Sequence, residues 1–221
     1  MKKCALILCF ILLLAASACA PAQQPQAQAQ QPAQQPKADV KQPAPEPAAA
    51  KQEISAEVRD LLDKSKTRVK SIYYKYRGPE TGSNFHEFYV KGDKIKYKPH
   101  LEIKTLDRPD SYDSVFIDKT LKTAQSYCTA AYCTYKGKKA DLIYANAYLQ
   151  TIFDWTGGLT NANKVGEEVI DSRSTWKIET NNGILWVDTF YGIPLKVESG
   201  GKTYKFEQIS VNTVADADVT P

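Results

Sequence analysis

Aromatic residues, which usually dominate a hydrophobic core, are confined almost entirely to one part of this chain. Of the 23 aromatic side chains among 221 residues, Phe10 is followed by none until Tyr73. All 11 glycines lie beyond residue 77, whereas seven of the 12 prolines lie between Pro21 and Pro47. A packed core therefore has to be built from about the last 170 residues, which is an ordinary size for one domain.

The beginning of the chain has the pattern of an export signal that ends at a cysteine. Two lysines precede an unbroken apolar run over residues 5–16, which is too short to span a bilayer and is typical of a secretory signal peptide. Ala16-Ser17-Ala18 directly before Cys19 resembles a lipobox, in which the cysteine is lipidated and becomes the mature N-terminus. We therefore predict a signal peptide over residues 1–18 and an extracytoplasmic, membrane-anchored lipoprotein attached through Cys19. The alternative is an ordinary A-x-A cleavage site with Cys19 incidental.

Residues 19–52 form a segment in which Ala, Gln and Pro predominate and almost nothing is available for burial. Such a segment cannot offset the entropy lost on ordering, so we predict a disordered tether between the lipid anchor and the domain. Its reach is roughly 30 Å as a random coil and up to about 100 Å when extended. A plain spacer is favoured over a binding role.

Beyond residue 52 the patterns of secondary structure begin. Apolar residues from Ile54 to Val69 recur at helical spacing, with Ser55 as a candidate N-cap, and β-branched and aromatic residues follow over 69–76. A first group of strands is predicted over 84–91, 94–98, 101–104, 114–118, 123–128 and 131–135. A second helix is predicted over 141–155. A second group of strands follows over 164–171, 175–180, 183–189, 195–199 and 203–211. Short strands with two helices and no βαβ alternation indicate an α+β fold with an antiparallel sheet.

Two of these strands have informative faces. Over residues 94–98 three lysines alternate with Ile95 and Tyr97, as in a half-buried strand. A solvent-facing role for the lysines is favoured over contact with anionic head groups. Over residues 183–189, Trp186 lies on one face while Leu185 and Val187 lie on the other, so this strand is predicted to be covered on both sides.

No pattern for catalysis or for a cofactor is found. The only two histidines, His86 and His100, have no residues at metal-ligand spacing around them, and the sequence has no G-x-S-x-G, phosphate-binding glycine loop or H-E-x-x-H. Without the two lysines of the signal, the chain has 27 basic and 25 acidic residues. This small net charge is not the clustered basic charge that nucleic-acid binding requires. We predict a protein that is not an enzyme and has no metal, no cofactor and no nucleic-acid partner.

Cys128 and Cys133 are the only cysteines after Cys19. Their C-x4-C spacing, with a predicted strand on each side, lets them pair across a hairpin end. A single pair without further ligands is poor zinc evidence. In an exported protein a structural disulfide is favoured over two free thiols.

One block near the C-terminus is similar to a known family. It consists of the stretch Leu185-Trp186-Val187-Asp188-Thr189, the turn Tyr191-Gly192-Ile193-Pro194-Leu195 and the strand that closes at Val211-Asn212. Together they resemble the strand–turn–strand of the LolA/LolB-like lipoprotein-carrier superfamily. The resemblance is strongest over residues 165–212, and the order of elements agrees over 53–212. It implies a strongly curved, unclosed antiparallel half-barrel whose concave apolar face is covered by helices and holds acyl chains.

These observations lead to one functional hypothesis and an alternative. We expect a LolA-like domain over residues 53–212, with 213–221 as a C-terminal tail, that binds a lipid or the acyl chain of a lipoprotein, with an envelope protein as a further candidate partner. The alternative is a structural or protein-interaction lipoprotein whose core is filled by its own side chains. An empty acyl-sized cavity favours the first and a filled core the second. The predicted cavity residues are Ile72, Phe88, Ile95, Tyr97, Phe116, Leu149, Phe153, Trp186 and Phe206.

Overall fold

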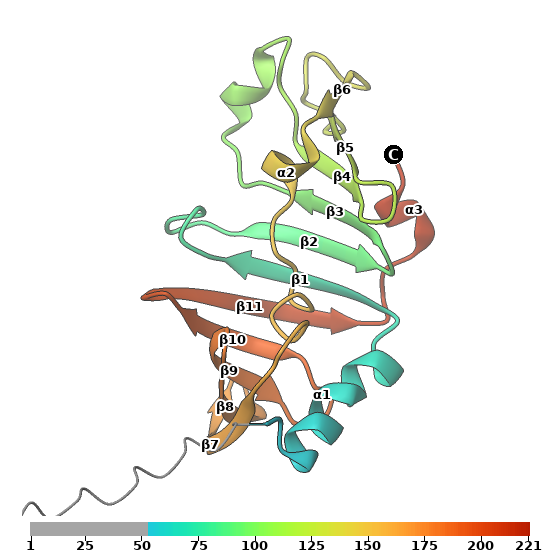
Figure 1. Cartoon of the computed structure of the whole chain (residues 1–221). Coiled ribbons are helices and arrows are strands. Elements are labelled where there is room, and N and C mark those ends of the chain that lie inside the picture. Colours follow the sequence, from blue (N-terminus) through green and yellow to red (C-terminus); the bar gives the residue numbers. More distant parts are fainter. Residues whose placement is uncertain (1–52) are drawn as a thin grey trace, which may run out of the picture. The chain divides into compact units, whose positions relative to one another are not determined.

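Eleven β-strands form a single antiparallel sheet in the computed structural model, which describes residues 53–221 (Figure 1). The strands are β1 Ser71–Arg77, β2 His86–Lys91, β3 Lys94–Lys98, β4 Ser114–Asp118, β5 Thr123–Tyr127, β6 Lys139–Leu142, β7 Ala162–Ile170, β8 Arg173–Thr180, β9 Gly183–Asp188, β10 Pro194–Ser199 and β11 Lys202–Val211. The predicted signal peptide, Cys19 and the tether lie outside the described residues.

The sheet consists of two consecutive meanders joined in the middle. The strand order is β6-β5-β4-β3-β2-β1-β11-β10-β9-β8-β7, so the first and last strands of the chain pair with each other. The edge strands β6 and β7 do not pair, and the sheet stays an open, curved half-barrel with few helices, visible in Figure 1. The predicted α+β half-barrel is thereby confirmed.

The connection between β6 and β7 has to cross the entire sheet, because these strands are neighbours in sequence and opposite edges in space. Ten strand spacings amount to about 48 Å along the sheet. The residues from 143 to 161 cover about 65 Å when extended. The chain forms one helical turn, α2 Tyr144–Ala147, and then runs as irregular backbone across the sheet in Figure 1. We call residues 143–161 the strap, and the face that it covers the inner face.

The helix predicted over 141–155 is therefore wrong. At about 1.5 Å per residue it would rise only about 22 Å, which leaves too little chain to reach β7. Its apolar spacing reflects contacts that the strap makes with the inner face, and its first two residues, 141 and 142, belong to β6.

Helix α1, Ala56–Arg68, packs on the half of the domain that contains β7 to β10. Its apolar positions Val58, Leu61 and Leu62 are buried in the core, as the helical spacing predicted. Lys64 Nζ donates to the Thr189 carbonyl at 2.8 Å, and an Arg68 guanidinium nitrogen donates to the Phe190 carbonyl at 2.7 Å. The helix is therefore fixed to the turn between β9 and β10.

The main core lies between the inner face, α1 and the strap. Alternate residues of the central strands point into it, such as Ile72 and Tyr74 of β1 and Phe88 of β2. Tyr74 stacks on Phe88 with ring centroids 5.2 Å apart and meets Phe206 edge-on at 5.5 Å. This alternation with period two is what the sequence of these strands dictates.

Two short predicted strands are absent from the sheet. Residues 101–104 lead into a 3-10 helix, Ile103–Asp107, and residues 131–135 form turns. Both segments belong to a small second core of Leu106, Cys128 and Cys133, where local packing replaces strand pairing. The expected tail contains a short helix, α3 Asp216–Val219, and Val219 is buried beside Phe116.

Candidate functional site

Tyrosines of the sheet fasten the strap to the inner face. The Tyr97 hydroxyl of β3 donates to the Ala147 carbonyl at 3.1 Å, and the Tyr74 hydroxyl of β1 accepts the Ile152 N–H at 3.2 Å. Further along, Trp155 packs on Tyr204 of β11 with ring centroids 4.7 Å apart. Burial raises the pKa of Tyr97 to about 12 and also raises that of Tyr74 well above its ordinary value, so both hydroxyls stay neutral over the physiological range.

Asp154 organises the middle of the strap. Its carboxylate accepts hydrogen bonds from the Tyr148 hydroxyl and from the Thr151 N–H and hydroxyl, and it pairs with Lys119 at 3.0 Å. Burial alone would raise the pKa of Asp154, but these hydrogen bonds hold it below its ordinary value of 3.8. The carboxylate thus stabilises the fold above that ordinary pKa, and its contribution is lost as the pH falls through the lowered value.

Seven of the nine predicted cavity residues lie together at the inner face. Ile72, Phe88, Ile95, Tyr97 and Phe206 are buried in the main core, and Leu149 and Phe153 of the strap pack against them. However, they contact one another instead of surrounding an open space, because Ile152 of the strap is inserted and fully buried. The centre of the inner face is filled.

Phe116 and Trp186 lie on the opposite, outer face, so their placement in the cavity was wrong. Phe116 pairs in register with Lys96, and Trp186 with Lys177 and Lys196, whereas the inner-face residues occupy the alternate positions. Trp186 is covered by the Lys196 ammonium 4.0 Å from its ring centroid, and its N–H donates to Glu168 at 2.6 Å. Lysine stems and a carboxylate cover this strand from outside, which its apolar pattern alone does not reveal.

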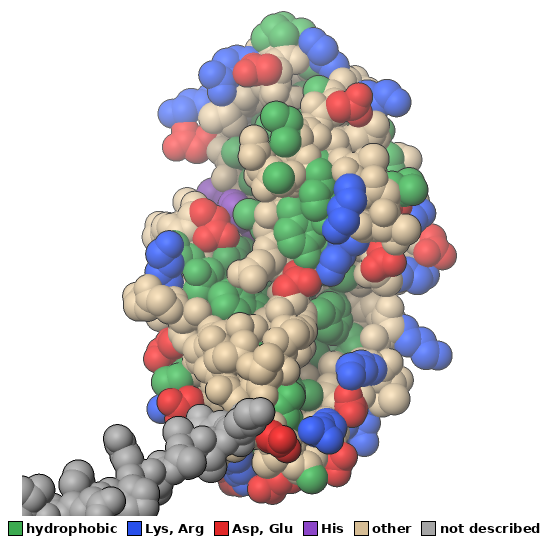
Figure 2. Space-filling view, viewed as in Figure 1, with side chains coloured by type: hydrophobic (Ala, Val, Ile, Leu, Met, Phe, Trp, Pro, Cys, Tyr) green, Lys and Arg blue, Asp and Glu red, His purple; other side chains and the backbone are tan. Residues whose placement is uncertain are grey.

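Open space is found at the mouth of the inner face, between α1 and the strap. A cleft of about 310 Å³ has an apolar wall of Val69, Val90 and Phe153, with Ser65 of α1 and Gly157 of the strap at its sides. We call it the α1–strap cleft. A second cleft of about 300 Å³ shares Ser65, Lys66 and Thr156 with it and continues along α1 to Leu62 and Leu159. Figure 2 shows hydrophobic side chains at the surface on the strap side.

Sequence reasoning missed most of this cleft. Of its lining, only Phe153 was predicted as a ligand contact. Residues 156–158 directly follow the helix predicted over 141–155, whereas in the structure they are the part of the strap that lines the clefts beside α1. Gly158 has a φ of +67°, a backbone conformation that favours glycine. The glycine at this position is therefore the one signal in the sequence that the chain bends here.

A larger cleft of about 460 Å³ lies beside the second core, and its walls combine charged and polar groups with aromatic and aliphatic side chains such as Tyr132 and Leu101. Glu87 and Lys98 of the sheet face Asp113, and His100 and Tyr132 complete the rim. The His100 N–H donates to His86 Nδ1 at 3.3 Å, and burial lowers the pKa of His86. The Asp113 carboxylate already accepts hydrogen bonds from Ser114, Thr129 and Ala130. These contacts are structural, and the walls do not provide an apolar site.

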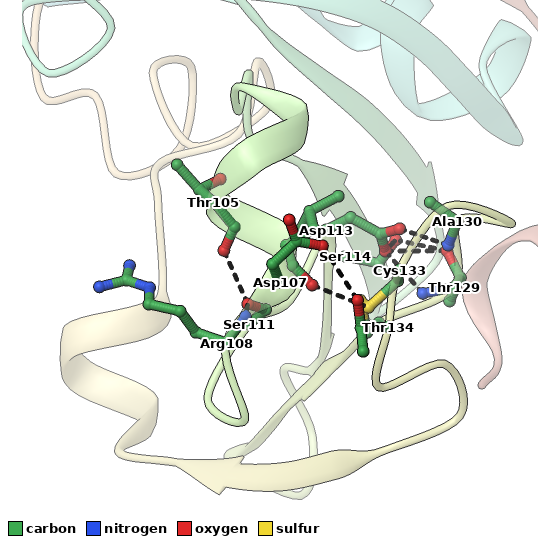
Figure 3. The surroundings of a disulfide bond; sticks show 12 residues. Thr105, Asp107, Arg108, Ser111, Asp113, Ser114, Thr129, Ala130, Cys133 and Thr134 are labelled. Atoms are coloured by element: carbon green, nitrogen blue, oxygen red, sulfur yellow. Dashed lines mark hydrogen bonds between the residues drawn. A yellow bond between two sulfur atoms is a disulfide. The ribbon is translucent and has the colours of Figure 1, made fainter.

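The disulfide predicted between Cys128 and Cys133 is present in the structure and holds the wall of this larger cleft (Figure 3). Polar contacts surround it: Thr134 donates to Asp107 at 2.9 Å, and the Ser111 hydroxyl donates to the Thr105 carbonyl at 2.7 Å. Figure 3 shows these residues converging from the 3-10 helix and the loop after β5. Around this second core, the disulfide and side-chain hydrogen bonds hold the chain in place of strand pairing.

Replacing both Cys128 and Cys133 by serine should leave the domain folded with a lower melting temperature. The loop that the disulfide closes is short, so the loss in unfolding free energy should be at most roughly 2–3 kcal/mol. Thermal unfolding followed by circular dichroism measures this. Alkylation of both thiols in native, unreduced protein would contradict the disulfide.

Within 53–221, no three His, Cys, Asp or Glu side chains are grouped as ligands for a metal ion. In the same range, no helix has the length and apolar character needed to cross a bilayer.

An open, curved antiparallel half-barrel is the fold that the resemblance to the LolA/LolB-like superfamily implied, although α1 and the strap cover its inner face where helices were expected. No protein-family model matches the sequence, and no curated protein matches it either.

Solved structures with a similar fold exist at low sequence identity. MucB is 16% identical with a TM-score of 0.44, over 76% of this chain and 63% of MucB, so this chain spans less than two thirds of MucB. The Mycobacterium tuberculosis lipoprotein LppX is 15% identical with a TM-score of 0.43, over 74% of this chain and 97% of LppX. LprF from Mycobacterium bovis is 12% identical with a TM-score of 0.42, over 76% of this chain and 98% of LprF.

Proposed function

We propose that this protein is a non-catalytic lipoprotein of the cell envelope that binds the acyl chain of a lipid or of a lipoprotein in the α1–strap cleft, as part of lipid or lipoprotein carriage. One observation carries the proposal: the apolar cleft of about 310 Å³ lies where α1 and the strap meet over the open half-barrel. Sites for hydrophobic ligands are concave, mostly apolar and bordered by a few polar groups. Ser65, Lys66 and Lys70 at its rim provide such groups.

The strap is built as a cover that can be displaced. It has one helical turn and no strand pairing of its own, and two tyrosine hydroxyls bond its backbone to the sheet. The buried Trp155 N–H of the strap has no acceptor within the described part of the chain. Segments with few regular hydrogen bonds are the ones that open most readily.

A second candidate function rests on the filled centre of the inner face. Ile152 occupies the position at which a deep acyl-chain cavity was expected, and the core around it is closed. This favours a structural or protein-interaction lipoprotein whose core is filled by its own side chains. The two candidates differ in one measurable property, which is binding of an apolar ligand.

A soluble chain of residues 20–221 should bind a fluorescent fatty acid saturably. Gly157→Phe should weaken this binding by roughly tenfold or more, because the new ring fills the cleft. A Cβ at residue 157 would lie 3.6 Å from the Asp154 carbonyl oxygen, an ordinary contact, so the fold should tolerate the substitution. Fluorescence titration gives both dissociation constants.

Leu101→Trp is the matched control, since it adds an aromatic group to the polar cleft beside the disulfide. Its affinity should equal that of the parent chain. If the parent chain binds no fatty acid while circular dichroism shows it folded, the carrier function is wrong and the second candidate stands.

The location of the protein is part of the proposal. Lipidation of Cys19 after removal of residues 1–18 would hold the domain at the extracytoplasmic side of a membrane, through the tether of residues 20–52. The lipobox-like sequence before Cys19 supports this. Two or more acyl chains on one residue suffice for stable anchoring.

A further inference from the structure

The two open edges of the sheet differ in charge. The segment from the β4–β5 turn through β6, residues 118–143, carries five lysines and two aspartates. The β7 edge, residues 162–171, carries one lysine, two glutamates and one aspartate. Each edge also presents strongly exposed aliphatic side chains, Leu121 at 69% and Ile143 at 70% on the first and Val169 at 69% on the second.

On the basic edge, the exposed apolar residues and the lysines form one surface. Leu121 lies in the β4–β5 turn, and Ile143 directly follows β6, which pairs with β5. The Lys122 ammonium lies 5.2 Å from the ring centroid of Tyr144, so turn and strap meet here. Tyr144 in turn stacks on Tyr148 at 5.4 Å. We call Leu121, Lys122, Ile143 and Tyr144, together with Lys139 further along β6, the basic edge patch.

This combination has the chemistry of a lipid–water interface. Aliphatic side chains that enter the acyl region, tyrosines at head-group level and lysines beside them are the groups that hold a protein on an anionic bilayer. In Figure 2, lysine or arginine side chains lie directly beside hydrophobic ones on the upper half of the domain.

The length of chain before the domain allows such contact. The domain begins next to β7, where Ile54 bridges to Ala162, and the patch lies at the opposite edge. The width of the sheet is about 48 Å, whereas the 34 residues from Cys19 to residue 53 reach up to about 110 Å. An anchor at Cys19 therefore leaves the patch free to meet the same membrane.

We infer that the basic edge patch docks the domain on an anionic lipid surface. This second membrane contact is independent of the lipid anchor, and it orients the domain with β6 toward the bilayer. It adds to the proposed function, because it brings a lipid-binding domain to the surface from which an acyl chain would be taken. It does not depend on occupation of the α1–strap cleft.

The test uses the chain of residues 20–221, which lacks Cys19, in cosedimentation with vesicles. The parent chain should bind phosphatidylglycerol-containing vesicles and not pure phosphatidylcholine, and raising the salt concentration should weaken binding. Lys122→Glu with Lys139→Glu, and separately Leu121→Ser with Ile143→Ser, should each lower the affinity by about tenfold or more. All four side chains are exposed, so these variants should remain folded.

Val169→Ser on the acidic edge is the matched control and should bind as the parent does. Equal binding to neutral vesicles, an equal loss with Val169→Ser, or no binding by the folded parent would each overturn the inference. A folded parent that binds an envelope protein through the patch, and no vesicle, overturns it as well. Fatty-acid titration without vesicles should be unaffected by the patch variants, which separates this inference from the proposed function.

Discussion

Replacing Gly192 by alanine is expected to lower the free energy of unfolding by more than about 3 kcal/mol. Gly192, in the turn between β9 and β10, has a φ of +71°, which disfavours any residue with a Cβ. A Cβ at this position would also lie 2.2 Å from the Leu61 carbonyl oxygen and 3.1 Å from the Ser65 nitrogen, both in the backbone of α1. Backbone atoms of a packed helix cannot yield cheaply, so α1 has to move away from the turn.

Gly201→Ala is the control for backbone strain alone. Its φ of +73° is nearly the same, but a Cβ there meets nothing within 4 Å. It should cost only about 1–2 kcal/mol, as a side chain in the left-handed region does. Chemical denaturation of both variants measures the difference, which isolates the clash with α1. Equal losses would show that the turn does not hold the helix.

The same comparison tests the origin of the candidate site. Ser65 of α1, which faces Gly192, borders the α1–strap cleft. If the turn positions α1, then Gly192→Ala should weaken fatty-acid binding at concentrations of denaturant where the domain is still folded. Gly201→Ala should leave binding unchanged.

Replacing Ile152 by alanine should lower the free energy of unfolding by about 2–5 kcal/mol, because this fully buried strap residue fills the inner face. The same change should increase the affinity for a fatty acid, since it removes the side chain that occupies the centre of the half-barrel. An apolar cavity of this kind stays dry and accepts apolar ligands. Denaturation and fluorescence titration on one preparation give both quantities.

Ile178→Ala on β8 is the matched control for this prediction. Ile178 is equally buried in the same core but belongs to the sheet. It should destabilise by a similar amount without raising the affinity. A gain in affinity for both variants would mean that general loosening admits the ligand. If Ile152→Ala does not raise the affinity for the fatty acid, the Ile152 side chain does not occupy a space that a ligand could fill.

Much of the sheet followed from patterns that are local in the sequence. Strands such as 94–98 and 114–118 have the predicted bounds, because alternation of apolar and polar residues is decided within one strand. The cysteine pair was likewise readable from its spacing. The strap was not: Tyr148, Leu149 and Phe153 recur at helical spacing, although only Tyr144–Ala147 are helical there and residues 152–158 form turns. Contacts with several different strands produced a pattern that a single helix face also produces.

The sequence also did not predict which face of the sheet each apolar residue occupies. Phe116 and Trp186 are as apolar as Phe88, and alternation within each strand left open which face turns inward. Only the register with Lys96 and Lys196 on the neighbouring strands assigns them to the outer face.

By itself, the sequence determined that the sheet is antiparallel, that the domain contains a disulfide and that the start of the chain is similar to an export and lipidation signal. These properties depend on composition and on neighbours within a few residues. The tertiary structure alone decided that β6 and β7 are opposite edges, and hence that the strap crosses and fills the inner face. It alone placed the open space between α1 and residues 153–157, because a cleft is formed by side chains that are distant in sequence and meet only after the whole sheet has assembled.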